Sequence, residues 1–137
     1  MGNSVSYASN AMSAQEKHEW LQSVQPGDII MFKRGLSIYW AIYVGNGKVI
    51  HFSGACLDIG GRIIEEEIWD VIGQHKARVH NGRDDRWNPL PPEEIVQRAR
   101  YALETSERNL SLRNSEHFAI YCRYGQMNNA QLIFLAD

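Results

Sequence analysis

The sequence is poor in several features that would have indicated a particular class of protein. It has only two cysteines in 137 residues, too few for a disulfide scaffold, which favours a reducing compartment. Its formal net charge of −2 gives no reason to expect a nucleic-acid partner. No apolar run approaches the roughly 18 residues of a membrane span. These absences leave one ordinary domain, for which 44% hydrophobic residues can supply a core.

Metal-binding groups are also sparse. The closest grouping is His75 and His80 with Asp84 and Asp85, whose spacing matches no standard metal-ligand pattern. We therefore expect solvated loop residues here, and neither a metal nor another cofactor.

The first residues admit two interpretations. Met1–Ser6 fits the N-myristoylation pattern, with Gly2 as the acceptor, although one acyl chain binds membranes only marginally. Ser9-Asn10-Ala11 before a second methionine instead resembles a scar left by cloning. Under either interpretation we expect residues 1–12 to form a flexible arm and residues 13–137 to form the domain.

Strand and turn signals dominate the first half of the domain. A capping-box pattern of Ser13 and Glu16 predicts a helix to about Val24, which Pro26-Gly27 ends. Three segments then have the composition of strands, namely Asp28–Lys33, Tyr39–Val44 and Lys48–Phe52.

The strongest short hairpin signal is Asn46-Gly47, which lies between two of these strands and predicts a type I′ turn. If the turn is central, Ile42 pairs with His51, and Tyr39 is a diagonal neighbour of His51 at best. A histidine in such an apolar strand is more often a hydrogen-bonded structural residue than a catalytic one.

Helix signals dominate the second half. Arg62–Val71 suits a helix or an irregular strand, Lys76–His80 a strand, and Asn81–Asn88 a loop. Pro91-Pro92-Glu93-Glu94 opens a helix. Its predicted buried stripe is Ile95, Ala99, Ala102 and Leu103. Strands followed by helices predict an α+β domain.

A second helix is expected to begin at Asn114 or Ser115 and to run to about Tyr124, with Gly125 at its C′ position. Ser115 then lies where backbone N–H groups are unpaired and an oxyanion would find donors. Serine is equally a favoured N-cap at this position, and for an isolated serine the capping role is the better explanation.

Four motifs in one order change this assessment. They are Pro26-Gly27-Asp28-Ile29-Ile30, Trp40–Gly47, Pro89–Ile95, and Asn114 with Glu116-His117-Phe118 and Arg123-Tyr124-Gly125. Together they resemble the lecithin:retinol acyltransferase family, and within it the small phospholipase A/acyltransferases first described as HRAS-like suppressors. The resemblance extends over roughly residues 25–125.

The resemblance implies a circularly permuted papain-like fold of the NlpC/P60 group, with an antiparallel sheet packed against helices. It also implies a cysteine that attacks a lipid ester and carries the acyl group as a thioester. A histidine directly before the Trp-Ala motif acts as general base, and a second histidine orients it. By position these three slots are Ser115, Tyr39 and His51, of which only His51 retains the family's residue. The neighbours expected to support the site or an oxyanion are Asn114, Glu116 and Trp40.

Both replacements remove chemistry. A thiol can be pushed to thiolate, whereas a serine hydroxyl needs a general base, and a neutral tyrosine is a poor one. A repaired site would use His51 as the base for Ser115, which requires a separation of about 3 Å, with Tyr39 as an oxyanion donor. Cys56, expected in a loop, and Cys122, expected on the buried side of the helix, replace neither group.

Three explanations remain open. Ser115 is an engineered replacement for cysteine, the chain is a natural pseudoenzyme, or the site is rebuilt around His51 and Ser115. We favour a pseudoenzyme that acts as a lipid-surface or protein-interaction module, because two positions have lost their chemistry. The rivals are a working phospholipase A/acyltransferase on phospholipid acyl esters and, by analogy with papain-like relatives, a peptide or isopeptide hydrolase.

We expect the protein in the cytoplasm, and at a membrane surface if Gly2 is acylated. The resembling branch commonly ends in a hydrophobic anchor, whereas this sequence ends at Asp137 after Leu132–Leu135. Either the anchor has been removed or acylation of Gly2 replaces it.

Overall fold

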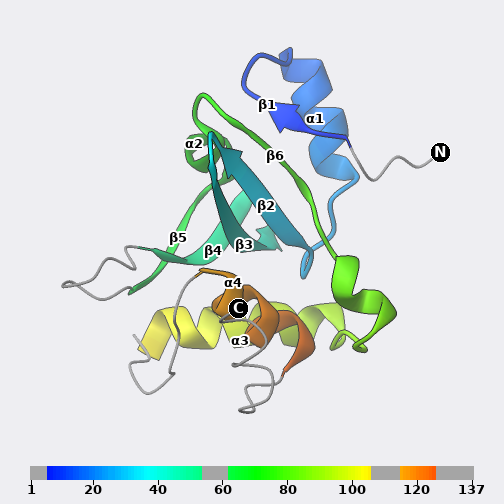
Figure 1. Ribbon diagram of the computed structural model, residues 1–137, viewed down its shortest axis with the longest axis vertical. Coiled ribbons are helices and arrows are strands. Elements are labelled where there is room, and N and C mark those ends of the chain that lie inside the picture. The colour runs from blue at the N-terminus through cyan, green and yellow to red at the C-terminus, as the bar shows by residue number, and fades with distance from the viewer. Residues whose placement is uncertain (1–5, 54–61, 106–114, 126–137) are drawn as a thin grey trace.

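The computed structural model describes residues 6–53, 62–105 and 115–125, which form one sheet flanked by helices (Figure 1). The strands of the six-stranded sheet lie in the order β1-β6-β2-β3-β4-β5, and each neighbouring pair is antiparallel. The predicted α+β architecture is therefore confirmed. The elements are β1 (Ala8–Ser9), α1 (Ala14–Gln22), β2 (Ile29–Arg34), β3 (Ser37–Gly45), β4 (Lys48–Ser53), β5 (Arg62–Glu67), α2 (Ile68–Ile72), β6 (Lys76–Val79), the 3₁₀ turn η1 (Gly82–Asp85), α3 (Pro92–Thr105) and α4 (Ser115–Tyr124).

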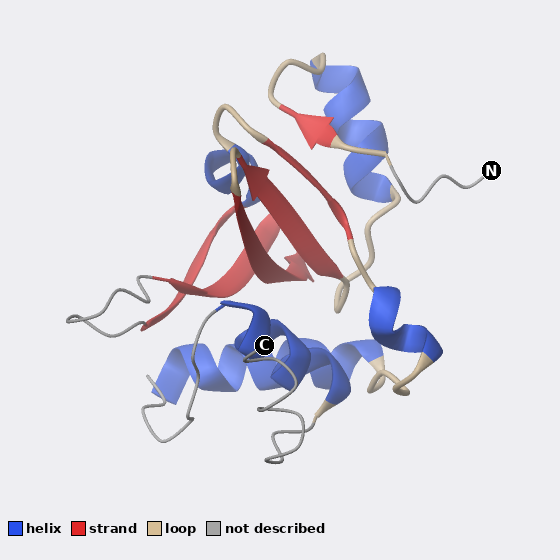
Figure 2. Ribbon diagram, in the orientation of Figure 1, coloured by secondary structure: helices blue, strands red, loops and turns tan. Residues whose placement is uncertain are grey.

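The central strands bury both of their faces, and this explains their nearly continuous apolar sequence. One face packs on α3 and α4, and the other packs against side chains of α1 and α2 (Figure 2). In β2, Ile29 belongs to the first core cluster, and Ile30 and Phe32 belong to the second. The first cluster positions α4, and with it the predicted nucleophile slot.

The capping box predicted at the start of α1 is confirmed. The Glu16 amide donates to Ser13 Oγ at 3.1 Å, and the Ser13 amide donates to Glu16 Oε1 at 2.8 Å, completing the capping box. Ala8 and Ser9, which we expected in an arm outside the fold, instead form β1 against β6, and Ala8 is fully buried. A two-residue strand carries too little sequence signal to be recognised, since its pairing partner lies almost seventy residues away.

The turn between β3 and β4 is confirmed, but the predicted register is wrong. Asn46 and Gly47 both have positive φ, 55° and 76°, as a type I′ turn requires. Ile42 pairs with Ile50 rather than with His51, because a bulge between Tyr43 and Gly45 gives β3 one extra residue. If this register continues, Ala41 lies opposite His51. Tyr39 and His51 then share one face of the sheet.

The structure shows what the ambiguous segment 62–71 forms. Arg62–Val71 is neither one helix nor one strand, since β5 ends at Glu67 and α2 begins at Ile68. In α3, Ile95, Ala99 and Ala102 are buried as predicted, while Leu103 is only partly buried. α4 ends before Gly125, whose φ of +76° fits the predicted C′ position.

Candidate functional site

Ser115 is the first residue of α4 and is 7% exposed. Its Oγ accepts a hydrogen bond of 3.1 Å from the backbone amide of Trp40 on β3. The paired stretch of β3 and β4 runs from Ile42 to Gly45, so the Trp40 amide lies beyond it. Ser115 therefore supplies an acceptor to a strand amide where the ladder has ended, which is a structural role for its oxygen.

His51 lies on β4 and is 2% exposed, with a hydrogen-bond partner on each ring nitrogen. Its Nδ1 lies 2.5 Å from the Tyr39 hydroxyl, and its Nε2 lies 2.9 Å from Glu66 Oε1 on β5. A carboxylate can only accept, so Nε2–H donates to Glu66. In the neutral ring Nδ1 then accepts from the Tyr39 hydroxyl, and neither partner is Ser115.

The electrostatics of this group favour neutral side chains. Burial lowers the pKa of His51, and the hydrogen bond and charge of Glu66 only partly oppose it. Burial likewise raises the pKa of Tyr39, against the effects of Ser53 and Arg34. Near neutral pH, Tyr39 therefore keeps its proton and His51 remains uncharged. We refer to Tyr39, His51 and Glu66 as the Tyr-His-Glu relay.

The other predicted site residues either lie apart from this relay or fall outside the residues that the structure describes. Glu116 forms an ion pair of 2.9 Å with Arg83 of η1. The ring of Trp40 contacts His80 edge to face, with centroids 5.0 Å apart. Asn114, Gly2 and Cys56 lie outside the described residues. The fold thus brings together Tyr39 with His51, and separately Ser115 with the Trp40 backbone.

Cys122 and the grouping of histidines and aspartates provide no alternative chemistry. Cys122 is fully buried, and burial raises the pKa of its thiol far above the ordinary value, as expected for an inert structural cysteine. Asp84 accepts hydrogen bonds from Arg123 and Tyr124. Among residues 6–53, 62–105 and 115–125, no group of three or more potential ligands is arranged to hold a metal ion.

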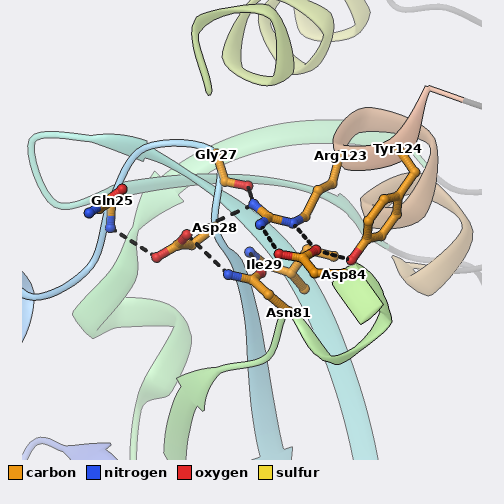
Figure 3. A network of polar contacts seen from close by, with 8 residues as sticks. All are labelled: Gln25, Gly27, Asp28, Ile29, Asn81, Asp84, Arg123 and Tyr124. Carbon is orange, nitrogen blue, oxygen red and sulfur yellow. Dashed lines mark hydrogen bonds and ion pairs between the residues drawn. The ribbon is translucent and has the colours of Figure 1, made fainter. Parts of the chain in front are cut away.

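A polar cluster that the sequence did not predict anchors the far end of α4 (Figure 3). Arg123 donates two hydrogen bonds, of 3.0 and 2.6 Å, to the Asp84 carboxylate and a third, of 2.8 Å, to the Gly27 carbonyl. The Tyr124 hydroxyl donates to Asp84 at 2.6 Å. Partial burial opposes ionisation, yet these donors and the charge of Arg123 hold the pKa of Asp84 below its ordinary value.

Asp28 and Asn81 extend the cluster to the start of β2 (Figure 3). Asn81 donates to Asp28 at 3.1 Å, and its side-chain oxygen accepts from the Ile29 amide at 2.9 Å. The cluster therefore joins the Pro-Gly-Asp motif to the Arg-Tyr-Gly motif and fixes α4 against β2. The only sequence signal was that both motifs contain charged residues beside glycines.

Comparison with known proteins gives a consistent result. A family model described as "Lecithin retinol acyltransferase" matches residues 22–128. Human phospholipase A and acyltransferase 3 is 34% identical over 122 residues, covering 79% of this chain and 75% of that protein. Human phospholipase A and acyltransferase 2 is 35% identical over 121 residues, covering 77% and 74%. Human phospholipase A and acyltransferase 1 is 32% identical over 115 residues, covering 74% and 68%.

Proposed function

Because the chain belongs to the lecithin retinol acyltransferase family, we propose that it binds phospholipid at a membrane surface without performing thioester chemistry. The observation that carries this proposal is the Tyr-His-Glu relay. His51 is the one family histidine that remains, and both of its nitrogens are already engaged, by Tyr39 and Glu66.

The relay argues against a site rebuilt around Ser115. To activate Ser115, His51 would need a free lone pair directed at the serine hydroxyl. Its only lone pair, on Nδ1, faces the Tyr39 hydroxyl, and Nε2–H is held by Glu66. Peptide or isopeptide hydrolysis would need the same nucleophile and base, so it is disfavoured for the same reason.

Lipid binding is supported by the relatives, whose names are those of phospholipases A and acyltransferases. Within the described residues, none of the helices combines the length and apolar character needed to cross a membrane. Acylation of Gly2 and a protein partner remain predictions. The first is checked by comparing vesicle co-sedimentation of acylated protein with that of a Gly2→Ala variant, where equal binding would remove Gly2 from the account.

Fatty-acid release from phosphatidylcholine vesicles tests the proposal. We expect background release from the wild type and from Ser115→Ala, and measurable release only when Ser115→Cys and Tyr39→His are combined. Each single reversion serves as a control and is expected to stay several orders of magnitude slower, because nucleophile and base act as one unit. Wild-type release that disappears in Ser115→Ala would show a working enzyme and refute the proposal.

A further inference from the structure

The hairpin between β2 and β3 ends in an exposed apolar tip. Leu36 is 105% exposed and Ile38 is 51% exposed, although large hydrophobic side chains elsewhere in these strands are mostly buried. Gly35, with a φ of +60° and open space around it, makes the turn. The β2 arrow points away from α3 and α4, so the tip lies at the end of the sheet opposite those helices, beside α2 and the loop that leads to β6 (Figure 1).

Cationic residues lie beside this tip, and two of them also contact the rest of the fold: Arg34 donates to the Val71 carbonyl at 2.8 Å, and the Lys76 ammonium lies over the Tyr7 ring. Lys33 and Arg34 precede the turn. In the register of the sheet, Lys33 lies opposite Ile38 of β3 on one side and opposite Lys76 of β6 on the other. Directly opposite residues share a face of an antiparallel sheet, so Lys33, Ile38 and Lys76 form one row. The tip therefore combines apolar and basic groups within a few residues.

The charge of the molecule is segregated across the sheet. β2, β3 and β6 contain four basic residues and no acidic one, in a chain whose net charge is −2. The acids gather instead on β5, at Glu65, Glu66 and Glu67. A surface on which exposed leucine and isoleucine lie beside lysine and arginine complements an anionic lipid bilayer in both polarity and charge.

We propose that this hairpin tip, residues 33–38 with Lys76, docks the protein onto a phospholipid bilayer containing anionic lipids. Leu36 and Ile38 enter the boundary between headgroups and acyl chains, and Lys33 contacts the phosphates, with Arg34 and Lys76 adding positive charge beside it. Two exposed apolar side chains at a turn can insert into fluid lipid, whereas a protein partner would need a pocket shaped to receive them. The inference rests on the proposed function and names the surface that performs it.

Docking by this tip would place the lipid at the end of the strand that carries Tyr39. Tyr39 follows Leu36 by three residues, or roughly 10 Å of extended strand. The next residue, Trp40, donates its amide to Ser115. The first residues of β3 therefore run from the tip to Tyr39 of the relay and then to the strand amide that contacts Ser115.

Vesicle co-sedimentation of unacylated full-length protein tests the proposal, with phosphatidylcholine alone or mixed with phosphatidylserine. We expect the wild type to bind the mixed vesicles more strongly. Leu36→Ser with Ile38→Ser should lower binding about tenfold or more by removing apolar contact. Lys33→Glu should lower binding to the mixed vesicles by about tenfold, because it reverses a charge at an anionic surface.

Matched controls lie elsewhere on the molecule. Tyr101→Ser removes a side chain that is 62% exposed on α3, and Lys48→Glu reverses a charge at the opposite end of β3 and β4. Both should bind as the wild type does. Thermal unfolding of every variant establishes that the fold persists.

Three results would overturn the proposal. If the wild type binds vesicles and the tip variants bind equally well, the hairpin is not the docking surface, although the proposed lipid function survives. If the wild type binds neither vesicle, both the docking surface and the proposed function fail. If the wild type associates with itself or with another purified protein but does not bind vesicles, and the tip variants lose that association, the tip is a protein contact.

Discussion

Replacing Tyr39 by phenylalanine removes one oxygen atom and tests the relay that carries the proposed function. In the wild type that oxygen lies 2.5 Å from Nδ1 of His51, whose side chain is 2% exposed. Without it, a buried acceptor loses its donor in a place that water scarcely reaches. An unsatisfied buried polar group costs about 1–3 kcal/mol, and we expect a decrease of that size in the free energy of unfolding near pH 8.

The same substitution should change the pH dependence of stability in a defined direction. The pKa of His51 is lowered from its ordinary value of 6.5, chiefly by burial. Stability from the neutral ring is therefore fully present above about pH 6.5 and is lost as the pH falls toward the folded pKa. The Tyr39 hydroxyl donates to the neutral ring, so its removal should raise the pKa of His51 toward 6.5. The deficit of Tyr39→Phe should then shrink from pH 8 to pH 5.5.

Urea unfolding at pH 8 and pH 5.5 measures the deficit, and NMR titration of the His51 ring measures its pKa. Tyr101→Phe is the control, since that side chain is 62% exposed and should change stability by less than about 0.5 kcal/mol. Equal stability of Tyr39→Phe and wild type at pH 8 would refute the hydrogen bond. A fall in the pKa of His51 would mean that the ring donates to Tyr39, which contradicts the assigned tautomer.

Two further substitutions test how the α4 end is held. Arg123→Lys should reduce the free energy of unfolding by about 2–4 kcal/mol in urea titration, because lysine cannot reproduce the two-point grip on a partly buried carboxylate. Arg100→Lys, in the more exposed pair with Glu65, should cost about 0–1 kcal/mol, and equal costs for the two variants would contradict a special role of the Arg123–Asp84 pair. Gly125→Ala should lower the urea midpoint more than Gly35→Ala. Both have positive φ, but only at Gly125 would a Cβ lie 2.9 Å from a Leu90 methyl carbon. A urea midpoint that falls more in Gly35→Ala than in Gly125→Ala would show that the Leu90 contact relaxes at no cost.

Features that depend on near neighbours in the chain could be predicted from residue types alone. The capping box of Ser13 and Glu16 begins α1, the Asn46-Gly47 pair makes the β3–β4 turn, and Gly125 terminates α4. Each rests on a backbone group or dihedral angle within four residues, so the local sequence contains the whole interaction. The family resemblance likewise rested on short motifs that can be read along this one chain, and the family comparison confirmed it.

Contacts across the sheet could not be predicted in this way, because they depend on register and on segments far apart in sequence. The bulge near Val44 shifts the pairing by one residue and puts Tyr39 beside His51, while β5 supplies Glu66 from fifteen residues away. Arg123 reaches Asp84 across 39 residues for the same reason. The residue types at the site follow from the chain, but only the tertiary pairing shows that both ring nitrogens of His51 already have partners.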